Sequence, residues 1–197
     1  MNKANKITMA RVIMSIIIII LMLFPFDQMG IDLPSYIVGG RINIELKYII
    51  IGILFIVASF TDFLDGYIAR KYNMVTDFGK MIDAISDKLL TNSVLIILGC
   101  SGKISAIIVV IIIARDIVVD SIKMVIGNKG YAVAAIPIAK VKTATLMIGI
   151  TLTLFYNLPF ELISLRISEF LLVLASILSI ISGVKYYIMA KPYIKDK

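Results

Sequence analysis

The sequence predicts an all-α, polytopic membrane protein with six transmembrane helices, and three observations support this fold class. The 197 residues are 60% hydrophobic and only 17% charged, with a mean hydropathy of +1.00, whereas soluble domains are about 45–50% apolar and about 25% charged. A chain of this length cannot bury so much apolar surface in one core surrounded by water. It also contains six apolar stretches of about 20 residues, the length of a membrane span. The third observation is an unequal distribution of lysine and arginine along the chain.

The predicted spans are joined by short connections. The first span resembles a signal peptide because basic residues precede its most apolar part, but no small-x-small cleavage site follows it, so we expect a retained span. The next segment, Asp27–Arg41, is rich in glycine and proline, which predicts an irregular loop. The six spans cover residues 7–26, 45–70, 79–100, 104–126, 139–156 and 166–190.

Lysine and arginine residues predict the orientation of these spans. An even number of spans places both termini on the same side of the membrane. If that side is cytoplasmic, thirteen basic residues lie at cytoplasmic ends and loops, and four (Arg41, Lys47, Lys103 and Arg166) lie on the opposite side. The positive-inside rule therefore predicts cytoplasmic termini. No repeat or linker interrupts the chain, so we expect a single membrane-embedded domain over residues 1–197, located in the cell membrane.

Two residue types that often carry chemistry are scarce. The chain has one cysteine, Cys100, and no histidine. An intramolecular disulfide is therefore excluded, and the commonest zinc ligand and general base is missing. A metal site would have to be lined by oxygen atoms, which favours Mg²⁺, Mn²⁺ or Ca²⁺. The net charge of +7 indicates anionic lipid headgroups before nucleic acid. Cys100 lies in a predicted turn and has no evident role.

Four of the 13 acidic residues lie at the cytoplasmic ends of spans two and three, where an ionised side chain is costly. Asp62 and Asp65 are three residues apart and Asp83 and Asp87 are four apart, so each pair shares one face of its helix. The connection between the spans is short, so the two faces can meet. Four neighbouring carboxylates need a counter-charge, and one or two divalent cations would supply it. The alternative is that all four are solvated helix ends at the water interface.

Small residues share these two faces and complete a longer pattern. The pattern spans 26 residues and reads Asp62-x2-Asp65-Gly66-x2-Ala69-Arg70-x8-Gly79-x3-Asp83-x3-Asp87. At all eight positions it resembles the signature of the CDP-alcohol phosphotransferase family. The resemblance implies the membrane fold of that family, an assembly as a homodimer, and a catalytic domain that displaces CMP from a CDP-linked lipid or alcohol with a hydroxyl group.

The same resemblance implies roles for individual residues. Asp62, Asp65, Asp83 and Asp87 would bind two divalent cations, Mg²⁺ or Mn²⁺, and Asp87 would also be the general base. The CDP part of the donor would be held by Gly66, Ala69, Arg70 and Gly79. The start of the chain, Asn5-x2-Thr8-x2-Arg11, resembles the N-terminal pattern of many family members and is expected near the nucleotide. Its alternative interpretation is a helix cap with charges that anchor the helix at the membrane interface.

The fourth span carries charges at a depth where they need a water-filled cavity. Arg115 lies near its middle, and Lys123 follows toward the cytoplasm together with Asp116 and Asp120 on one face. Lys140 and Lys142 stand at the start of the fifth span. Arg115, Lys123, Lys140 and Lys142 would form a basic pocket for an anionic acceptor. The alternative for the last two lysines is a topology signal.

This region is similar to the phosphatidylglycerophosphate synthases of the same family. The similarity implies that the donor is CDP-diacylglycerol and that the acceptor is sn-glycerol 3-phosphate, whose phosphate would meet the basic pocket from the cytoplasm. The sequence departs from the expected pattern at two positions. Asp116 stands where glutamate is common, and Lys123 stands where arginine is common, so the bidentate fork of arginine is missing there.

Three alternatives stay open at this point. Within the family, the acceptor could instead be phosphatidylglycerol, serine or an inositol phosphate. A second class is a carboxylate-lined cation transporter or channel, which an inverted repeat would favour, and the sequence contains none that we can detect. A third class is a structural membrane protein, which would need none of the eight motif residues.

Overall fold

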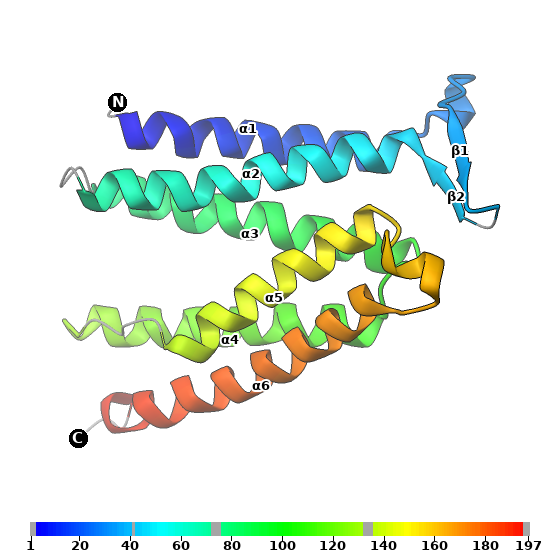
Figure 1. Cartoon of the computed structure of the whole chain (residues 1–197). Coiled ribbons are helices and arrows are strands. Elements are labelled where there is room, and N and C mark those ends of the chain that lie inside the picture. The colour runs from blue at the N-terminus through cyan, green and yellow to red at the C-terminus, as the bar shows by residue number, and fades with distance from the viewer. Residues whose placement is uncertain (1–2, 41, 72–75, 132–135, 195–197) are drawn as a thin grey trace.

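The structure is a computed structural model that describes residues 3–40, 42–71, 76–131 and 136–194, without the side chains of residues 3–4, 63–71, 77, 80 and 194. This part of the chain forms a bundle of long helices with a small hairpin at one end (Figure 1). The helices are α1 (Lys3–Leu23), α2 (Leu46–Lys71), α3 (Asp77–Cys100), α4 (Ala106–Asn128), α5 (Pro137–Leu154) and α6 (Ile167–Ile194). The connections contain two strands and two 3-10 helices, β1 (Ser35–Val38), β2 (Ile42–Glu45), η1 (Asp27–Met29) and η2 (Phe160–Ile163).

Local sequence explains where several of these helices begin and end. The side-chain oxygen of Thr76 accepts a hydrogen bond from the backbone N–H of Gly79 and thereby caps α3. α4 ends shortly before Gly130, whose φ of 82° lies in the left-handed region that glycine adopts without strain. α5 begins with Pro137 at its first position, where a helix needs no backbone N–H donor. The all-α prediction is confirmed for the described residues, apart from the hairpin.

Three of the described helices are long and apolar enough to cross a membrane. These segments are Asn5–Leu23 in α1, Pro137–Leu154 in α5 and Ile167–Tyr193 in α6. α4 carries four charged side chains within its length, which lower its apolar content. Those side chains line an interior cavity, so they need not face lipid. The chain is therefore a membrane protein, and the number of six spans stays a prediction.

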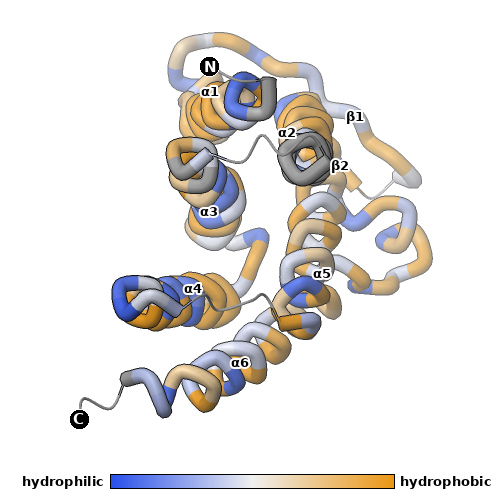
Figure 2. The backbone as a smooth tube through the Cα atoms, turned by 90° about the vertical axis from the view of Figure 1, so that its left-hand side faces the viewer, coloured by the Kyte–Doolittle hydropathy of each residue, from blue (hydrophilic) through white to orange (hydrophobic). Residues whose placement is uncertain are grey.

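The helices pack as two groups around one apolar core. α1 packs against α2 and α3, while α6 packs against α4 and α5. Contacts of α5 with α2, and of α4 with α3, join the two groups. Figure 2 shows α2, α3, α4 and α5 arranged around a common interior when the bundle is seen along its length. The core includes Ile18, Ile51, Phe55, Leu95, Ile112, Ile150 and Leu172.

Both chain ends lie at the same end of the bundle, and the hairpin lies at the opposite end (Figure 1). This placement agrees with an even number of passes. Which of the two ends faces the cytoplasm stays a prediction. We call the two ends the terminal end and the hairpin end.

The prediction of an irregular loop over Asp27–Arg41 is partly wrong. The segment contains η1 and β1, and β1 pairs antiparallel with β2, so that Tyr36 lies opposite Ile44. Two residues in the turn, Gly39 and Gly40, have φ values of 62° and 69°, a conformation that glycine adopts at little cost. The sequence signal was the β-branched and aromatic run on both sides of these glycines, which favours a hairpin. Arg41 lies outside the described residues.

Candidate active site

Arg11 of α1 joins the carboxylates of two other helices at the terminal end. Its side chain is fully buried, and its Nη1 donates to Oδ1 of Asp62 at 2.5 Å and to Oδ1 of Asp83 at 3.1 Å. The two carboxylate side chains remain 40% and 53% exposed. One nitrogen therefore bridges a carboxylate of α2 and a carboxylate of α3. The acidic faces of these two helices thus lie next to each other, as the short connection between them predicted. A helix-anchoring charge at the membrane interface would not be fully buried, so this alternative does not fit Arg11.

The chemistry of these donors suits a hard divalent cation. The carboxylates that Arg11 joins offer only oxygen, the donor that such cations prefer, and Arg11 supplies one positive charge between them. Among the side chains that the structure describes, no group of three or more carboxylate, cysteine or histidine residues is close enough to hold a metal ion. The side chain of Asp65 lies outside that description, as do the side chains of Ala69 and Arg70 and the surroundings of Gly66.

The N-terminal pattern lies against the start of α3. The amide of Asn5 donates to the hydroxyl of Thr76 at 3.2 Å, and the same hydroxyl caps Gly79 at 3.0 Å. A Cβ atom on Gly79 would lie 2.7 Å from the amide oxygen of Asn5 and 3.0 Å from Oγ1 of Thr76. A side chain at this position would therefore force the Asn5 amide to move. Thr8, one turn from Arg11, is also buried. The sequence did not point us to Thr76, although its position before an apolar helix is a typical cap signal.

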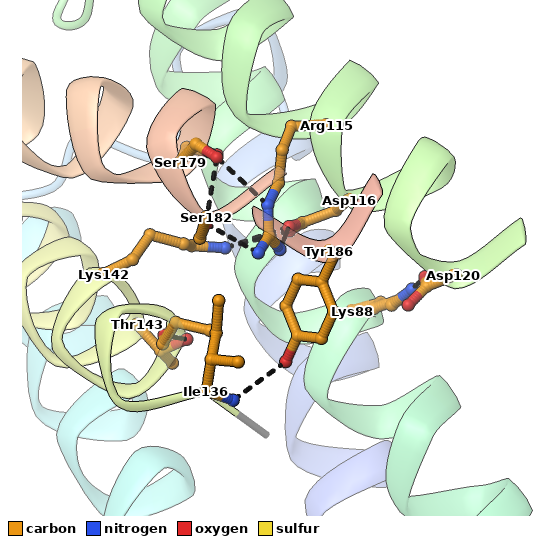
Figure 3. A network of polar contacts seen from close by, with 11 residues as sticks. Lys88, Arg115, Asp116, Asp120, Ile136, Lys142, Thr143, Ser179, Ser182 and Tyr186 are labelled. Atoms are coloured by element: carbon orange, nitrogen blue, oxygen red, sulfur yellow. Dashed lines mark hydrogen bonds and ion pairs between the residues drawn. The ribbon is translucent and has the colours of Figure 1, made fainter. Parts of the chain in front are cut away.

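A second polar cluster lies between α4, α5 and α6 (Figure 3). Arg115 donates through Nη1 to Oδ1 of Asp116 at 2.8 Å, and Nζ of Lys142 lies 3.0 and 3.2 Å from the two oxygens of the same carboxylate. From α6, the hydroxyl of Ser182 accepts from Nη2 of Arg115 at 2.7 Å, and the carbonyl of Ser179 accepts from Nε at 3.3 Å. These side chains are largely buried, at 12% exposure for Arg115, 16% for Asp116 and 6% for Lys142. A topology signal would face solvent, so this interpretation does not fit Lys142.

An aromatic ring contacts two of the predicted acceptor residues. The ring of Tyr186 is 1% exposed, and its centroid lies 5.0 Å from Nζ of Lys123 and 5.6 Å from Cζ of Arg115. Its hydroxyl accepts a hydrogen bond from the backbone N–H of Ile136 at 3.2 Å. Sequence alone does not single out Tyr186, because tyrosine near the end of a span usually marks the membrane interface.

One cavity connects the acidic and the basic residues. It has a volume of about 530 Å³ and is lined from α2 through α6, a size in the range of small-molecule sites. Asp62 and Asp87 contribute to one part of its wall, and all four predicted acceptor residues contribute to the wall as well. Lys88 and Asp120 form an ion pair between α3 and α4 at the same cavity (Figure 3). The complete lining is Asp62, Asp87, Lys88, Arg115, Asp116, Asp120, Lys123, Ala139, Lys140, Lys142, Thr143, Ala144 and Tyr186.

Comparison with known proteins assigns the chain to a family. A statistical description of the CDP-alcohol phosphatidyltransferase family matches residues 1–182. The chain belongs to this family. The resemblance inferred from the eight-residue motif is therefore confirmed, and so is the prediction of an enzyme that transfers phosphatidyl groups.

Relatives from several bacteria carry the same name. A Bacillus subtilis (strain 168) protein named CDP-diacylglycerol–glycerol-3-phosphate 3-phosphatidyltransferase is 39% identical over 186 residues, which cover 94% of this chain and 93% of that protein. A Rickettsia felis protein of the same name is 38% identical, and one from Rickettsia bellii is 36% identical. Both Rickettsia alignments cover 82% of this chain and 90% of the relative. The similarity therefore extends over most of each protein.

Proposed function

We propose that this phosphatidyltransferase transfers the phosphatidyl group of CDP-diacylglycerol to sn-glycerol 3-phosphate, which yields phosphatidylglycerophosphate and CMP for phospholipid biosynthesis. The observation that carries the proposal is the shared cavity, because carboxylates and five basic side chains line one space. The names of the relatives supply the substrates. A neutral acceptor such as serine would need fewer cations than this cavity offers.

The donor would bind at the acidic part of the cavity. Asp62, Asp65, Asp83 and Asp87 would hold two divalent cations, Mg²⁺ or Mn²⁺, which when bound neutralise charge on the pyrophosphate oxygens. Arg11 binds Asp62 and Asp83, and Asn5 lies at the close contact of α1 with Gly79, with buried Thr8 between them in the sequence. We assign the CDP part of the donor to these three residues of α1 together with Gly66, Ala69, Arg70 and Gly79. The acyl chains would remain in the bilayer.

The acceptor would bind at the basic part of the same cavity. The phosphate of sn-glycerol 3-phosphate would meet Arg115, Lys123, Lys140 and Lys142. Asp116 contacts Arg115 and Lys142, and the ring of Tyr186 lies beside Arg115 and Lys123. Because the donor and acceptor parts share one space, the two substrates can be held in reacting positions without a large rearrangement. We place the terminal end, and with it the cavity, on the cytoplasmic side, where sn-glycerol 3-phosphate is dissolved.

The transfer then needs one proton acceptor and one displacement. Asp87 would take the proton of the 1-hydroxyl group of the acceptor. The hydroxyl oxygen forms a bond to the phosphorus atom of the phosphatidyl group, and the bond from that phosphorus to the oxygen of CMP breaks. CMP leaves with the electron pair, and the lipid product stays in the membrane. We further propose that one membrane-embedded domain, assembled as a homodimer in the cell membrane, performs this reaction.

The proposal is tested with purified protein in mixed micelles that contain labelled CDP-diacylglycerol. A panel of acceptors is supplied with Mg²⁺, with Mn²⁺ or with a chelator, and the release of CMP and the lipid product are measured. We expect product from sn-glycerol 3-phosphate only when a divalent cation is present. Equal rates with serine, inositol phosphate or phosphatidylglycerol would contradict the acceptor, and undiminished rates with the chelator would contradict the cations.

A further inference from the structure

One face of α6 contacts the predicted acceptor pocket, although no residue of α6 was expected in the site. Ser179, Ser182, Gly183 and Tyr186 follow one another at helical spacing and therefore share a face. The first two accept hydrogen bonds from Arg115, as described above. A Cβ atom on Gly183 would lie 3.2 Å from Cγ of Arg115. The arginine side chain therefore lies directly along this face of α6.

Tyr186 differs from its neighbours on this face because it contacts several parts of the pocket. Its ring lies within cation–π distance of both Arg115 and Lys123. These two residues belong to different turns of α4, and their positive charges, both beside the same ring, repel each other. The electron-rich face of the ring offsets part of that repulsion, so both cations can stay beside the cavity before a substrate arrives.

The hydroxyl of Tyr186 contacts the element that supplies the remaining basic residues. It accepts the hydrogen bond of Ile136, the residue directly before α5. Lys140 and Lys142 follow within the first two turns of that helix. One buried side chain of α6 therefore lies within cation–π distance of two cations of α4 and is hydrogen-bonded to the residue before the helix that carries the other two. Figure 3 shows Tyr186 beside Arg115 and its hydrogen bond with Ile136.

We propose that Tyr186 is a positioning residue for the acceptor phosphate, acting through Arg115 and Lys123. The proposal rests on the proposed function for the identity of the acceptor. Holding cations in place before binding lowers the ordering cost that the acceptor must overcome. Loss of the ring should therefore weaken binding of sn-glycerol 3-phosphate and leave binding of the lipid donor unchanged.

Three variants separate the ring from the hydroxyl and from the helix surface. Tyr186→Leu removes the ring and the hydroxyl, whereas Tyr186→Phe removes only the hydroxyl and keeps the ring. Tyr187→Leu is the matched control, because the neighbouring tyrosine is 56% exposed and does not line the cavity. The KM for each substrate and kcat are measured for all three. Binding of sn-glycerol 3-phosphate is measured separately, by the increase in Tm that it causes.

For Tyr186→Leu we expect the KM for sn-glycerol 3-phosphate to rise roughly tenfold, with the KM for CDP-diacylglycerol unchanged and kcat within about twofold of the wild type. Tyr186→Phe and Tyr187→Leu should both resemble the wild type, and only Tyr186→Leu should lose the increase in Tm. An unchanged KM for sn-glycerol 3-phosphate in Tyr186→Leu, or equal rises in both KM values, would overturn the proposal. So would a defect in Tyr186→Phe as large as that in Tyr186→Leu.

The outcomes also separate this proposal from the proposed function. A wild-type protein that transfers nothing to sn-glycerol 3-phosphate would overturn the proposed function. In that case the change in Tm still tests Tyr186, with inorganic phosphate as the probe. A wild-type protein that transfers normally, together with an unaffected Tyr186→Leu variant, would overturn the positioning role alone.

Discussion

The two helix groups of the bundle each bury an arginine, but they surround it with opposite kinds of partner. In the group of α1, α2 and α3, which we call the donor half, one cation lies between carboxylates that come from two other helices. In the group of α4, α5 and α6, the acceptor half, one carboxylate lies between two cations. At the contacts of Arg11 the donor half thus offers two carboxylates to one cation, which suits metal ions, and at the contacts of Asp116 the acceptor half offers two cations to one carboxylate, which suits a phosphate.

The comparison also shows how each half limits the cost of buried charge. A buried ion needs an opposite charge close by, because desolvation is otherwise not offset. Arg11 obtains it from helices far away in sequence, whereas Arg115 obtains it from its direct neighbour Asp116. The ion pair of Lys88 with Asp120 links the two halves beside the shared cavity. The charges at the shared cavity are therefore partly offset, by ion pairs within each half and by the pair that joins the halves.

The largest expected effect comes from replacing a carboxylate in the donor half. Asp87→Asn keeps the shape of the side chain but removes the proposed proton acceptor, so kcat should fall about 10²–10⁴-fold. The rate of CMP release at saturating substrates measures this loss. Asp32→Asn, in an exposed connection, is the control and should keep full activity. Near-normal turnover by Asp87→Asn, with an unchanged Tm, would contradict the assignment of the base.

A smaller effect is expected from removing a cation in the acceptor half. Lys142→Ala deletes a buried ammonium group that contacts both oxygens of Asp116. A charge-assisted hydrogen bond from this group to the acceptor phosphate would contribute roughly 1.5–3 kcal/mol, so the KM for sn-glycerol 3-phosphate should rise by about one to two orders of magnitude. The KM for CDP-diacylglycerol should stay near the wild-type value. A rise confined to the KM for CDP-diacylglycerol would contradict the division of the cavity into two parts.

Two glycine substitutions compare the packing of the halves. A Cβ at Gly79 would meet buried Asn5 at 2.7 Å, whereas a Cβ at Gly183 would meet Arg115 at 3.2 Å. Gly79→Ala should therefore lower the free energy of unfolding by about 1–3 kcal/mol and raise the KM for CDP-diacylglycerol. Gly183→Ala should lower the free energy of unfolding less and raise only the KM for sn-glycerol 3-phosphate. Thermal unfolding and substrate titrations measure both variants. A larger loss in Gly183→Ala than in Gly79→Ala would reverse the predicted order.

The smallest effect concerns the hairpin end, which lies outside both parts of the cavity. Burial raises the pKa of Tyr156 from 10.0 to about 12. Because the folded state holds this proton more tightly than the unfolded state, the stabilisation is present below pH 10 and is lost as the pH rises toward about 12.

The test is a comparison of Tm between the wild type and Tyr156→Phe over this pH range. The wild type should lose more Tm on the alkaline side than the variant does. Both proteins should have the same transfer activity at neutral pH, because Tyr156 lies far from the terminal end along the bundle. Parallel Tm curves would contradict the raised pKa, and a loss of activity would contradict the separation of the two ends.

The sequence predicted most of the helices and much of the site because both depend on local patterns. Apolar stretches and glycine or proline punctuation predict the helices to within a few residues. The i,i+3 and i,i+4 spacing of the aspartates places them on common faces, and the structure brings Asp62 and Asp83 to one arginine. The family followed from eight residues within a short segment. The hairpin was missed because the glycines and prolines favoured an irregular loop more strongly than the flanking residues favoured strands.

Contacts between distant segments could not be predicted in this way. Nothing near Tyr186 in the sequence indicates that its ring meets Arg115 and Lys123, which precede it by more than sixty residues. The role of Thr76 as a partner of Asn5 depends in the same way on the packing of α1 against α3. The alternative that Arg11 anchors the helix at the membrane interface is likewise decided by tertiary structure, because only the packing of α1 shows that this side chain is buried.

By itself, then, the sequence determined the membrane character, the helices, the family motif and the acidic and basic residues, because each depends on composition or on spacing along one helix. The tertiary structure alone decided which helices share a cavity, which carboxylates meet Arg11, and how Asp116 and α6 hold the basic residues. Those properties depend on how helix faces pack, and packing is set by side-chain shape and by the requirement that every buried charge has a partner.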